Sequence, residues 1–297
     1  IKLIMDTRGS MNETKIIHNG RLVDEETVRF SLNDTDLLYG YGCYEVLKVR
    51  NGLLYFPEDH VERLLSSAEI LGFEHDLDRD DLITALRMLV VSLELVDANL
   101  RIVVLAHDGR PADWYILPQP ALFPPKNAKT SGVDCLLYQG ERHFPKAKSL
   151  SMLLSTVAFR AASKRSCYDA LLVDRTGEIT EGTRTNVFFV DKDAPDTVYT
   201  PPAARVLSGI TRKTFLQSLD AAGRPWKEAP LRLDEVLGGR YGLLVSSTST
   251  TLVPVARLLD QEGIGVHTLP VFDELKKLSA HYDVWLSARE AELRGTP

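Results

Sequence analysis

The sequence predicts an α+β fold, because strand-like and helix-like segments are mixed along the chain without a regular βαβ alternation. Short apolar runs bounded by Asn-Gly and Thr-Gly turns indicate strands, and longer runs with apolar residues at helical spacing indicate amphipathic helices. A Pro-rich stretch near the middle of the 297-residue chain suits an extended connector. Two domains are therefore expected.

The composition excludes several classes of protein. With 44% hydrophobic and 26% charged residues the chain is typical of a globular protein, and it lacks the run of about 18 apolar residues that would predict a membrane span. A net charge of -6 with dispersed Lys and Arg gives no basic stripe for nucleic acid or a membrane surface. Three widely spaced cysteines and no metal motif favour a cytoplasmic protein with a small-molecule partner.

The first part of the chain is predicted to open as a sheet. Residues 1–11 are typical of an expression-vector remnant that ends at a native start, and they are excluded from the fold prediction. Asn19-Gly20 and Asn51-Gly52 each separate two strand-like runs, which predicts two hairpins. A helix is expected between Pro57, at its first turn, and Gly72, which stops it. A second helix at 80–95 and strands at 101–106 and 114–117 should follow.

The connector divides the rest of the chain. Residues 12–124 are expected to form the first domain, 125–132 the linker and 133–297 the second domain. The elements predicted in the second domain are strands at 133–138, 170–174, 186–190 and 243–246 and helices at 150–163, 209–222 and 271–293.

Two lysines and one acid are candidates for chemistry. A lysine acts as a Schiff-base nucleophile only where burial or a neighbouring charge lowers its pKa, and a solvated lysine is far more common. Lys146 and Lys148 would share one face of a strand, so periodicity leaves both open. Glu181 precedes an apolar strand, where a plain loop acid is the simpler interpretation. The alternative is a carboxylate that keeps a pyridine nitrogen protonated.

Three further features could bind an anion. Residues 209–211 open a predicted helix, whose first amides can bind a phosphate, unless Ser208 only caps the helix. The run 246–251 offers several hydroxyl groups, although such runs are usually loops. Arg63 could clamp a phosphate or form a surface ion pair with Asp59 one turn earlier.

Read in order, five segments resemble the signature of class IV (fold type IV) aminotransferases, the family of the D-amino acid and branched-chain aminotransferases. They are Tyr39-Gly40-Tyr41-Gly42-Cys43-Tyr44-Glu45-Val46, His60-x-x-Arg63-Leu64, Lys148-Ser149-Leu150, Thr180-Glu181-Gly182-x-x-x-Asn186-Val187-Phe188 and Gly209-Ile210-Thr211-Arg212. The spacing from Lys148 to Glu181 looks like that of D-amino acid aminotransferases, and it selects Lys148 over Lys146. The resemblance covers nearly the whole chain.

The resemblance implies a smaller N-terminal α/β domain and a larger C-terminal domain with a β-barrel-like core, cofactor and substrate between them, and a homodimer. Pyridoxal 5'-phosphate is the implied cofactor. Lys148 would hold it as an aldimine and move the substrate α-proton, and Glu181 would bind the pyridine nitrogen. The implied phosphate ligands are Arg63, Ile210, Thr211, Ser247 and Thr248. The implied substrate residues are Tyr44, Val46 and Lys48, which alternate along one strand, with Arg110 and Ser249.

The predicted function is transfer of an amino group from a D-amino acid, a branched-chain amino acid or a primary amine to a 2-oxo acid. Two departures leave the subtype open. D-amino acid aminotransferases carry an Arg-x-His pair in the loop at 107–113, where Arg110 could supply the charge but Asp113 stands near the place of the histidine. Branched-chain enzymes carry Phe-Glu-Gly at 44–46 and usually Glu at Thr251.

Two alternatives belong to other classes of function. A 4-amino-4-deoxychorismate lyase would use the same fold and lysine for β-elimination, and a silent protein would only bind the cofactor.

Arg184, in a segment that is usually built of small residues, is expected to reach solvent.

Overall fold

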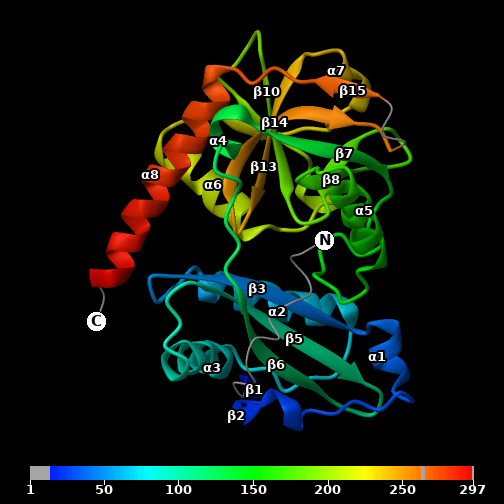
Figure 1. The fold of residues 1–297 in the computed structure, drawn as a ribbon, viewed down its shortest axis with the longest axis vertical. Helices are drawn as coiled ribbons and strands as arrows, with labels where there is room; N and C mark the ends of the chain where they lie inside the picture. The colour runs from blue at the N-terminus through cyan, green and yellow to red at the C-terminus, as the bar shows by residue number, and fades with distance from the viewer. Residues whose placement is uncertain (1–13, 262–264, 296–297) are drawn as a thin grey trace. The chain divides into compact units, whose positions relative to one another are not determined.

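The computed structural model describes residues 14–261 and 265–295, which form two compact units (Figure 1). Unit 1 extends to Leu122 and also contains Ala147–Met152, whereas unit 2 contains Phe123–Lys146 and the chain from Leu153 onward. The predicted vector remnant lies outside the described residues. Within those residues, no helix is long and apolar enough to cross a membrane. Both units combine sheet and helix, which confirms the predicted α+β class.

Unit 1 is a six-stranded antiparallel sheet in the order β2-β1-β6-β5-β3-β4 (Figure 1). The predicted hairpins form at Asn19-Gly20 and Asn51-Gly52. The strands are β1 (Lys15–His18), β2 (Arg21–Asp24), β3 (Gly42–Arg50), β4 (Leu53–Leu54), β5 (Ala98–His107) and β6 (Arg110–Pro120). The helices are η1 (Glu25–Thr27), α1 (Thr35–Tyr39), α2 (Pro57–Leu71) and α3 (Arg79–Ser92).

The two faces of this sheet have different environments. Leu47 of β3 and Ile102 of β5 face α2 and α3, and together with Leu64 and Leu86 of these helices they form one fully buried apolar cluster. Burial of this apolar face is the main stabilising contribution of the unit. Because side chains alternate along a strand, the neighbours of Leu47 project to the opposite face.

Unit 2 contains a closed barrel of six strands. The strands follow one another as β10-β13-β14-β7-β8-β9, and β9 pairs with β10 to close the ring. The pairs β14–β7 and β7–β8 are parallel and the other four are antiparallel. These strands are β7 (Val133–Gln139), β8 (Asp169–Val173), β9 (Ile179–Gly182), β10 (Asn186–Asp191), β13 (Tyr241–Ser247) and β14 (Thr251–Leu259). The resulting mixed barrel agrees with the core that the resemblance implied.

Further strands and helices surround the barrel. The helices are α4 (Ala128–Ser131), α5 (Leu153–Lys164), η2 (Ala203–Arg205), α6 (Ile210–Ala221), α7 (Leu233–Leu237) and α8 (Asp273–Gly295), and the extra strands are β11 (Val198–Thr200), β12 (Trp226–Glu228) and β15 (Val266–Thr268). Phe188 of β10 packs edge-on against Phe215 of α6, with ring centroids 4.8 Å apart, and Phe215 packs against Tyr282 of α8. The even-numbered side chains of β10 therefore point out of the barrel toward α6.

The structure differs from the prediction at one helix, at the Pro-rich stretch and at one strand that was not predicted. The helix expected from residue 150 begins at Leu153, because the chain before it pairs with β3. Pro118 and Pro120, the first prolines of the Pro-rich stretch at 118–132 that was expected to be extended and unpacked, belong to the end of β6. Strand β14 escaped prediction because Pro254, which lacks an amide hydrogen and is atypical of a central strand, lies in its middle opposite Leu244.

Gly42, at the start of β3, should not tolerate a side chain. Its φ is 151°, and an added Cβ would lie 2.1 Å from the carbonyl oxygen of Val104. Gly42→Ala should therefore lower the free energy of unfolding by about 1–3 kcal/mol more than a control, measured by chemical denaturation. The control is Gly109→Ala, which also has a positive φ of 71° but has no atom within 4 Å of the added Cβ. Equal losses in the two variants would contradict the steric argument.

Candidate functional site

A buried carboxylate lies between β3 and α2. Glu45 is fully buried, and its two oxygens accept hydrogen bonds from Nε and Nη2 of Arg63 at 2.6 and 2.8 Å. Nδ1 of the equally buried His60 lies 2.8 Å from Oε2 of Glu45. His60 and Arg63 stand three residues apart on α2 and so project from one side of that helix. The surface ion pair considered for Arg63 is wrong, because Arg63 is buried and bonded to Glu45.

The charges of this group follow from its contacts. Burial raises the pKa of Glu45, but the charge and hydrogen bonds of Arg63, with those of His60, outweigh burial and hold that pKa well below its usual range. Burial lowers the pKa of His60 more than Glu45 raises it, and the positive charges of Arg63 and Lys148 lower it further. His60 is therefore neutral and donates Nδ1–H to the carboxylate, which leaves the buried Nε2 without a hydrogen-bond partner among the described residues.

Lys148 is held beside this group by its backbone. The amide of Tyr44 donates to the carbonyl of Lys148 at 2.9 Å, and the next residue, Ser149, bridges to Cys43 of β3. The amide of Lys148 donates to Oγ of Ser67 at 3.1 Å, and that hydroxyl donates to the carbonyl of Arg63 at 2.7 Å. Lys148 is half-buried, whereas Lys146 is exposed. Ser67 was missed by sequence reasoning, because one serine in an amphipathic helix carries no signal.

The amine of Lys148 lies on the sheet face opposite α2. Its Nζ is 4.5 Å from the ring centroid of Tyr44, and Cζ of Arg101 is 5.9 Å from the same centroid. Val46 is the register partner of Arg101 on β5. Nε of Arg101 is buried and has no hydrogen-bond partner among the described residues. Sequence reasoning missed Arg101, although a cation inside an otherwise apolar strand was a usable signal.

Two other predicted substrate residues already have partners. Lys48, which is 7% exposed, places Nζ 3.8 Å from the ring centroid of Tyr55. Arg110 is half-exposed, and its Nη1 donates to Oδ2 of Asp113 at 3.0 Å. The acid that departs from the family pattern thus binds the arginine that was expected to supply the charge.

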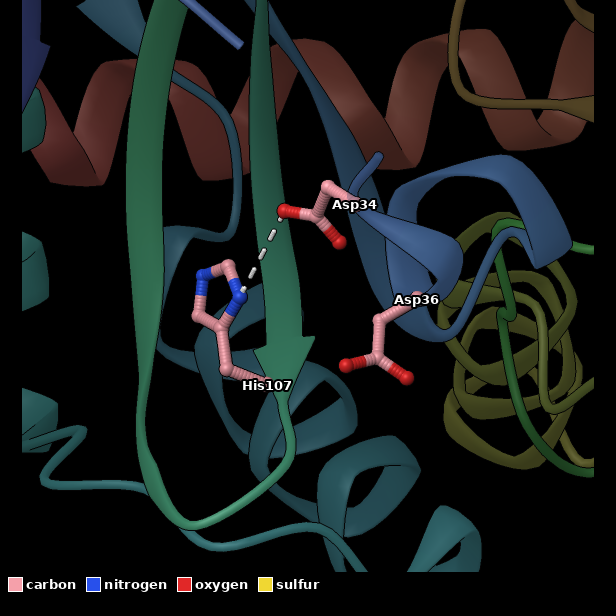
Figure 2. A group of neighbouring side chains, drawn as sticks. All are labelled: Asp34, Asp36 and His107. Atoms are coloured by element: carbon pink, nitrogen blue, oxygen red, sulfur yellow. Dashed lines mark ion pairs between the residues drawn. The ribbon is translucent and has the colours of Figure 1, made fainter. Parts of the chain in front are cut away.

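The turn between β5 and β6 is braced by acidic side chains around His107, and Figure 2 shows His107 with Asp34 and Asp36. Nε2 of His107 lies 3.0 Å from Oδ2 of Asp113, and its Nδ1 lies 3.9 Å from Oδ2 of Asp34. One ligand-type atom from each of His107, Asp34 and Asp36 lies within 4.8 Å of the others. The oxygens of Asp34 and Asp36 also accept backbone amides, so these contacts account for the group as a brace of the β5–β6 loop.

In unit 2, three polar side chains form a row across the outer face of the barrel. Asn186 of β10 pairs in register with Glu181 of β9 on one side and with Ser246 of β13 on the other. All three are buried, and Oγ of Ser246 has no hydrogen-bond partner among the described residues. Glu181 accepts the amide of Leu207 at 3.1 Å and lies 3.4 Å from Nη1 of Arg142. The loop-acid interpretation of Glu181 is therefore wrong, because Glu181 is a buried strand residue.

The start of α6 lies beside this row. Nδ2 of Asn186 donates to the carbonyl of Leu207 at 2.9 Å, and an added Cβ on Gly209 would lie 1.9 Å from Oδ1 of the same asparagine. The N-cap of α6 is Gly209, without a side-chain cap, so the alternative in which Ser208 caps the helix is wrong. Ile210 and Thr211 form the first turn, where backbone amides and the helix dipole favour an anion.

The hydroxyl-rich run forms a tight turn between β13 and β14. Ser247 pairs with Thr251 across a turn of three residues, in which Thr248 and Ser249 are half-buried and Thr250 is buried. The turn follows Ser246 directly, so its hydroxyls and the row on the barrel belong to the same end of β13.

These arrangements suit two kinds of chemistry. Unit 1 offers a primary amine beside a tyrosine, and such an amine can hold and move a proton. Unit 2 offers a buried carboxylate that could bind a protonated ring nitrogen, together with amide and hydroxyl donors for an anion.

Comparisons with known proteins place the chain in one family. The family model described as amino-transferase class IV matches residues 42–258. A D-alanine aminotransferase of Bacillus licheniformis is 28% identical over 84% of this chain and 90% of its own length. A putative branched-chain-amino-acid aminotransferase of Methanocaldococcus jannaschii is 28% identical over 91% of this chain and 98% of its own length. The PLP-bound structure of a hypothetical aminotransferase from Mycobacterium tuberculosis has a TM-score of 0.77 and 20% sequence identity, and the match covers 91% of this chain and 98% of that one.

The buried imidazole should make stability depend on pH. The pKa of His60 is lowered in the folded chain from its ordinary value of 6.5. As the pH drops from 7 to 5, His60 therefore takes up a proton more readily in the unfolded chain than in the folded chain, and the free energy of unfolding falls. The lowered pKa of Glu45 adds a further loss below 4.5. His60→Gln should flatten the slope of the unfolding free energy between pH 7 and 5, measured by chemical denaturation. The exposed His143, replaced by Gln, is the control and should keep the slope; an unchanged slope in His60→Gln would count against a neutral buried imidazole.

Proposed function

This chain belongs to the class IV aminotransferases, a family of pyridoxal-phosphate-dependent enzymes, and we propose that it transfers an amino group from an amino acid to a 2-oxo acid. The observation that carries the proposal is the position of the half-buried Lys148, whose Nζ lies 4.5 Å from the ring centroid of Tyr44. The relatives named as D-alanine and branched-chain aminotransferases support the same substrate class, α-amino acids.

The described residues fit pyridoxal 5'-phosphate. In unit 2 the buried Glu181 would bind the ring nitrogen, and the start of α6, at Ile210 and Thr211, would bind the phosphate. The buried and unpartnered Oγ of Ser246 supports a polar ligand at this place. Ser247 and Thr248 on the following turn would add hydroxyl donors.

In unit 1, Lys148 and Arg63 are the residues that we assign to the cofactor. Glu45 fixes the guanidinium of Arg63 through two hydrogen bonds, so Arg63 would approach a phosphate in a set orientation. When bound, the cofactor withdraws electrons from the substrate α-carbon. Lys148 would accept the α-proton at Nζ and return it on the product side.

Arg101 is the cation that we assign to the substrate carboxylate. Arg110, the residue expected for that role, already binds Asp113, and Lys48 lies against Tyr55. Arg101 lies near Tyr44, the same ring that Lys148 contacts, and its buried Nε lacks a partner in the described chain. A carboxylate would satisfy that donor, which is otherwise costly to bury. Val46 would line the same wall, because it pairs with Arg101 across the strands.

We also propose that the chain forms a homodimer. Four large apolar side chains within 30–39 are exposed: Phe30, Leu32, Leu38 and Tyr39. Such a concentration of exposed apolar side chains is typical of a protein interface.

Lys148 is expected to be the essential amine. Lys148→Ala should abolish formation of glutamate from 2-oxoglutarate with D-alanine or L-leucine as donor, because Lys148 is the amine that we assign to move the α-proton. The matched control Lys146→Ala, two residues earlier and exposed, should keep activity within about twofold, as is usual for surface substitutions. Activity retained in Lys148→Ala and lost in Lys146→Ala would reverse the assignment. Repeated turnover of 4-amino-4-deoxychorismate to pyruvate, without any 2-oxo acid acceptor, would favour the lyase instead.

Arg101 is expected to control recognition of the carboxylate. Arg101→Met should lower kcat/KM for amino acid donors by roughly 10- to 100-fold, because a hydrogen bond between charged groups is lost. It should change kcat/KM little for a primary amine that has no carboxylate, such as (R)-1-phenylethylamine. Arg110→Met is the control and should affect amino acid donors less. If Arg110→Met alone gave the large loss, the carboxylate would be read by the β5–β6 loop.

A further inference from the structure

The turn between β13 and β14 has a strained backbone. Thr251 has a φ of 61°, in the left-handed region that residues with a side chain seldom adopt. Its register partner is Ser247, so only three residues connect the two strands. A short turn of this kind keeps one conformation only where surrounding contacts determine it.

A chain of hydroxyl groups supplies these contacts. Oγ1 of the buried Thr250 shares a hydrogen bond with Oγ of Ser247 at 2.8 Å and another with the phenolic oxygen of Tyr168. Tyr168 lies 82 residues earlier in the sequence, immediately before β8. The turn is thus tied to a distant part of the barrel by one phenol.

Tyr168 is itself fixed on several sides. Its amide donates to the carbonyl of Asp134 at 2.8 Å, and its carbonyl accepts from Nη2 of Arg184 at 2.8 Å. The guanidinium carbon of Arg184 lies 3.9 Å from the ring centroid of Phe159 and 5.8 Å from that of Tyr168. Arg184 is exposed, as expected, but it also holds Tyr168 in place. Burial raises the pKa of Tyr168, so the phenol stays protonated at neutral pH.

We propose that Tyr168 is a positioning residue for the phosphate group of the cofactor: its hydroxyl holds Thr250, and through Thr250 the turn that presents Ser247 and Thr248 to the phosphate. The inference rests on the proposed function. Tyr168 acts through the turn, because its hydroxyl is directed at Thr250 and also interacts with Ser247, both of which belong to the turn. Loss of that hydroxyl should therefore weaken binding of the phosphate and leave the rest of the cofactor unaffected.

The experiment compares two ligands that differ only in the phosphate. Equilibrium dialysis of the full-length protein against pyridoxal 5'-phosphate and against pyridoxal gives one Kd for each, and both ligands can react with Lys148. Tyr168→Phe should raise the Kd for pyridoxal 5'-phosphate by roughly tenfold, the loss of one hydrogen bond, and leave the Kd for pyridoxal unchanged. The control Tyr199→Phe removes the hydroxyl of another tyrosine of unit 2, whose ring stacks on Phe189, and should change neither Kd.

A second pair of variants tests the route through Thr250. Thr250→Val removes the shared hydroxyl at nearly constant volume and should raise the Kd for pyridoxal 5'-phosphate as Tyr168→Phe does, whereas Thr250→Ser should keep the wild-type value. The double variant Tyr168→Phe/Thr250→Val should be little worse than either single variant, because both break the same chain.

The possible failures can be told apart. An unchanged Kd in Tyr168→Phe, or an equal rise for both ligands, overturns the role of Tyr168 while the wild-type protein still binds pyridoxal 5'-phosphate. Wild-type protein that binds neither ligand overturns the proposed function, and the role of Tyr168 with it.

Discussion

The arrangement of unit 1 depends on one buried negative charge. Glu45 stands in an apolar strand with no exposure to solvent, and an unpaired carboxylate there would cost several kcal/mol. Its pairing with Arg63 and His60 fixes α2 against β3 in one register, since both partners come from one side of that helix. One turn later, Ser67 connects the backbone of α2 to that of Lys148. The charge that orients the helix thus also sets the place of the reactive amine.

In unit 2, closure of the barrel has the corresponding effect. Pairing of β9 with β10 places Glu181 opposite Asn186. The two side chains then bind the two backbone polar groups of Leu207: Glu181 accepts its amide and Asn186 donates to its carbonyl. Leu207 lies just before α6, so the start of that helix is fixed relative to the barrel. The close approach of Asn186 to Gly209 leaves no room for a side chain at the N-cap of α6.

Local patterns were sufficient for much of this fold. The Asn-Gly hairpins and the helix between Pro57 and Gly72 were predictable because each depends on residues a few positions apart. Strand β14 was missed because Pro254 contradicts the local rule and is accommodated only inside the barrel. The association of residues 147–152 with unit 1 was also missed, since the pairing of Ser149 with Cys43 spans more than a hundred residues. At the site, residues of the matched motifs could be named from sequence; Ser67 gave no signal, and Arg101 was missed although a cation in an apolar strand was a usable one.

The charge partners show why site residues are harder to predict than elements. Asp59 lies one helical turn before Arg63, yet Arg63 bonds to Glu45 on strand β3. The buried charge of Glu45 must be paired, whereas an exposed ion pair contributes little to stability. Arg110 has its acid, Asp113, three residues later on the same strand, β6, and forms an ion pair with it. Whether a cation remains available for a substrate is therefore decided by which acids the fold brings to it. In this chain Asp113, which departs from the family pattern, pairs with Arg110. Recognition of a substrate carboxylate is therefore expected to shift to Arg101, on the sheet face beside Lys148.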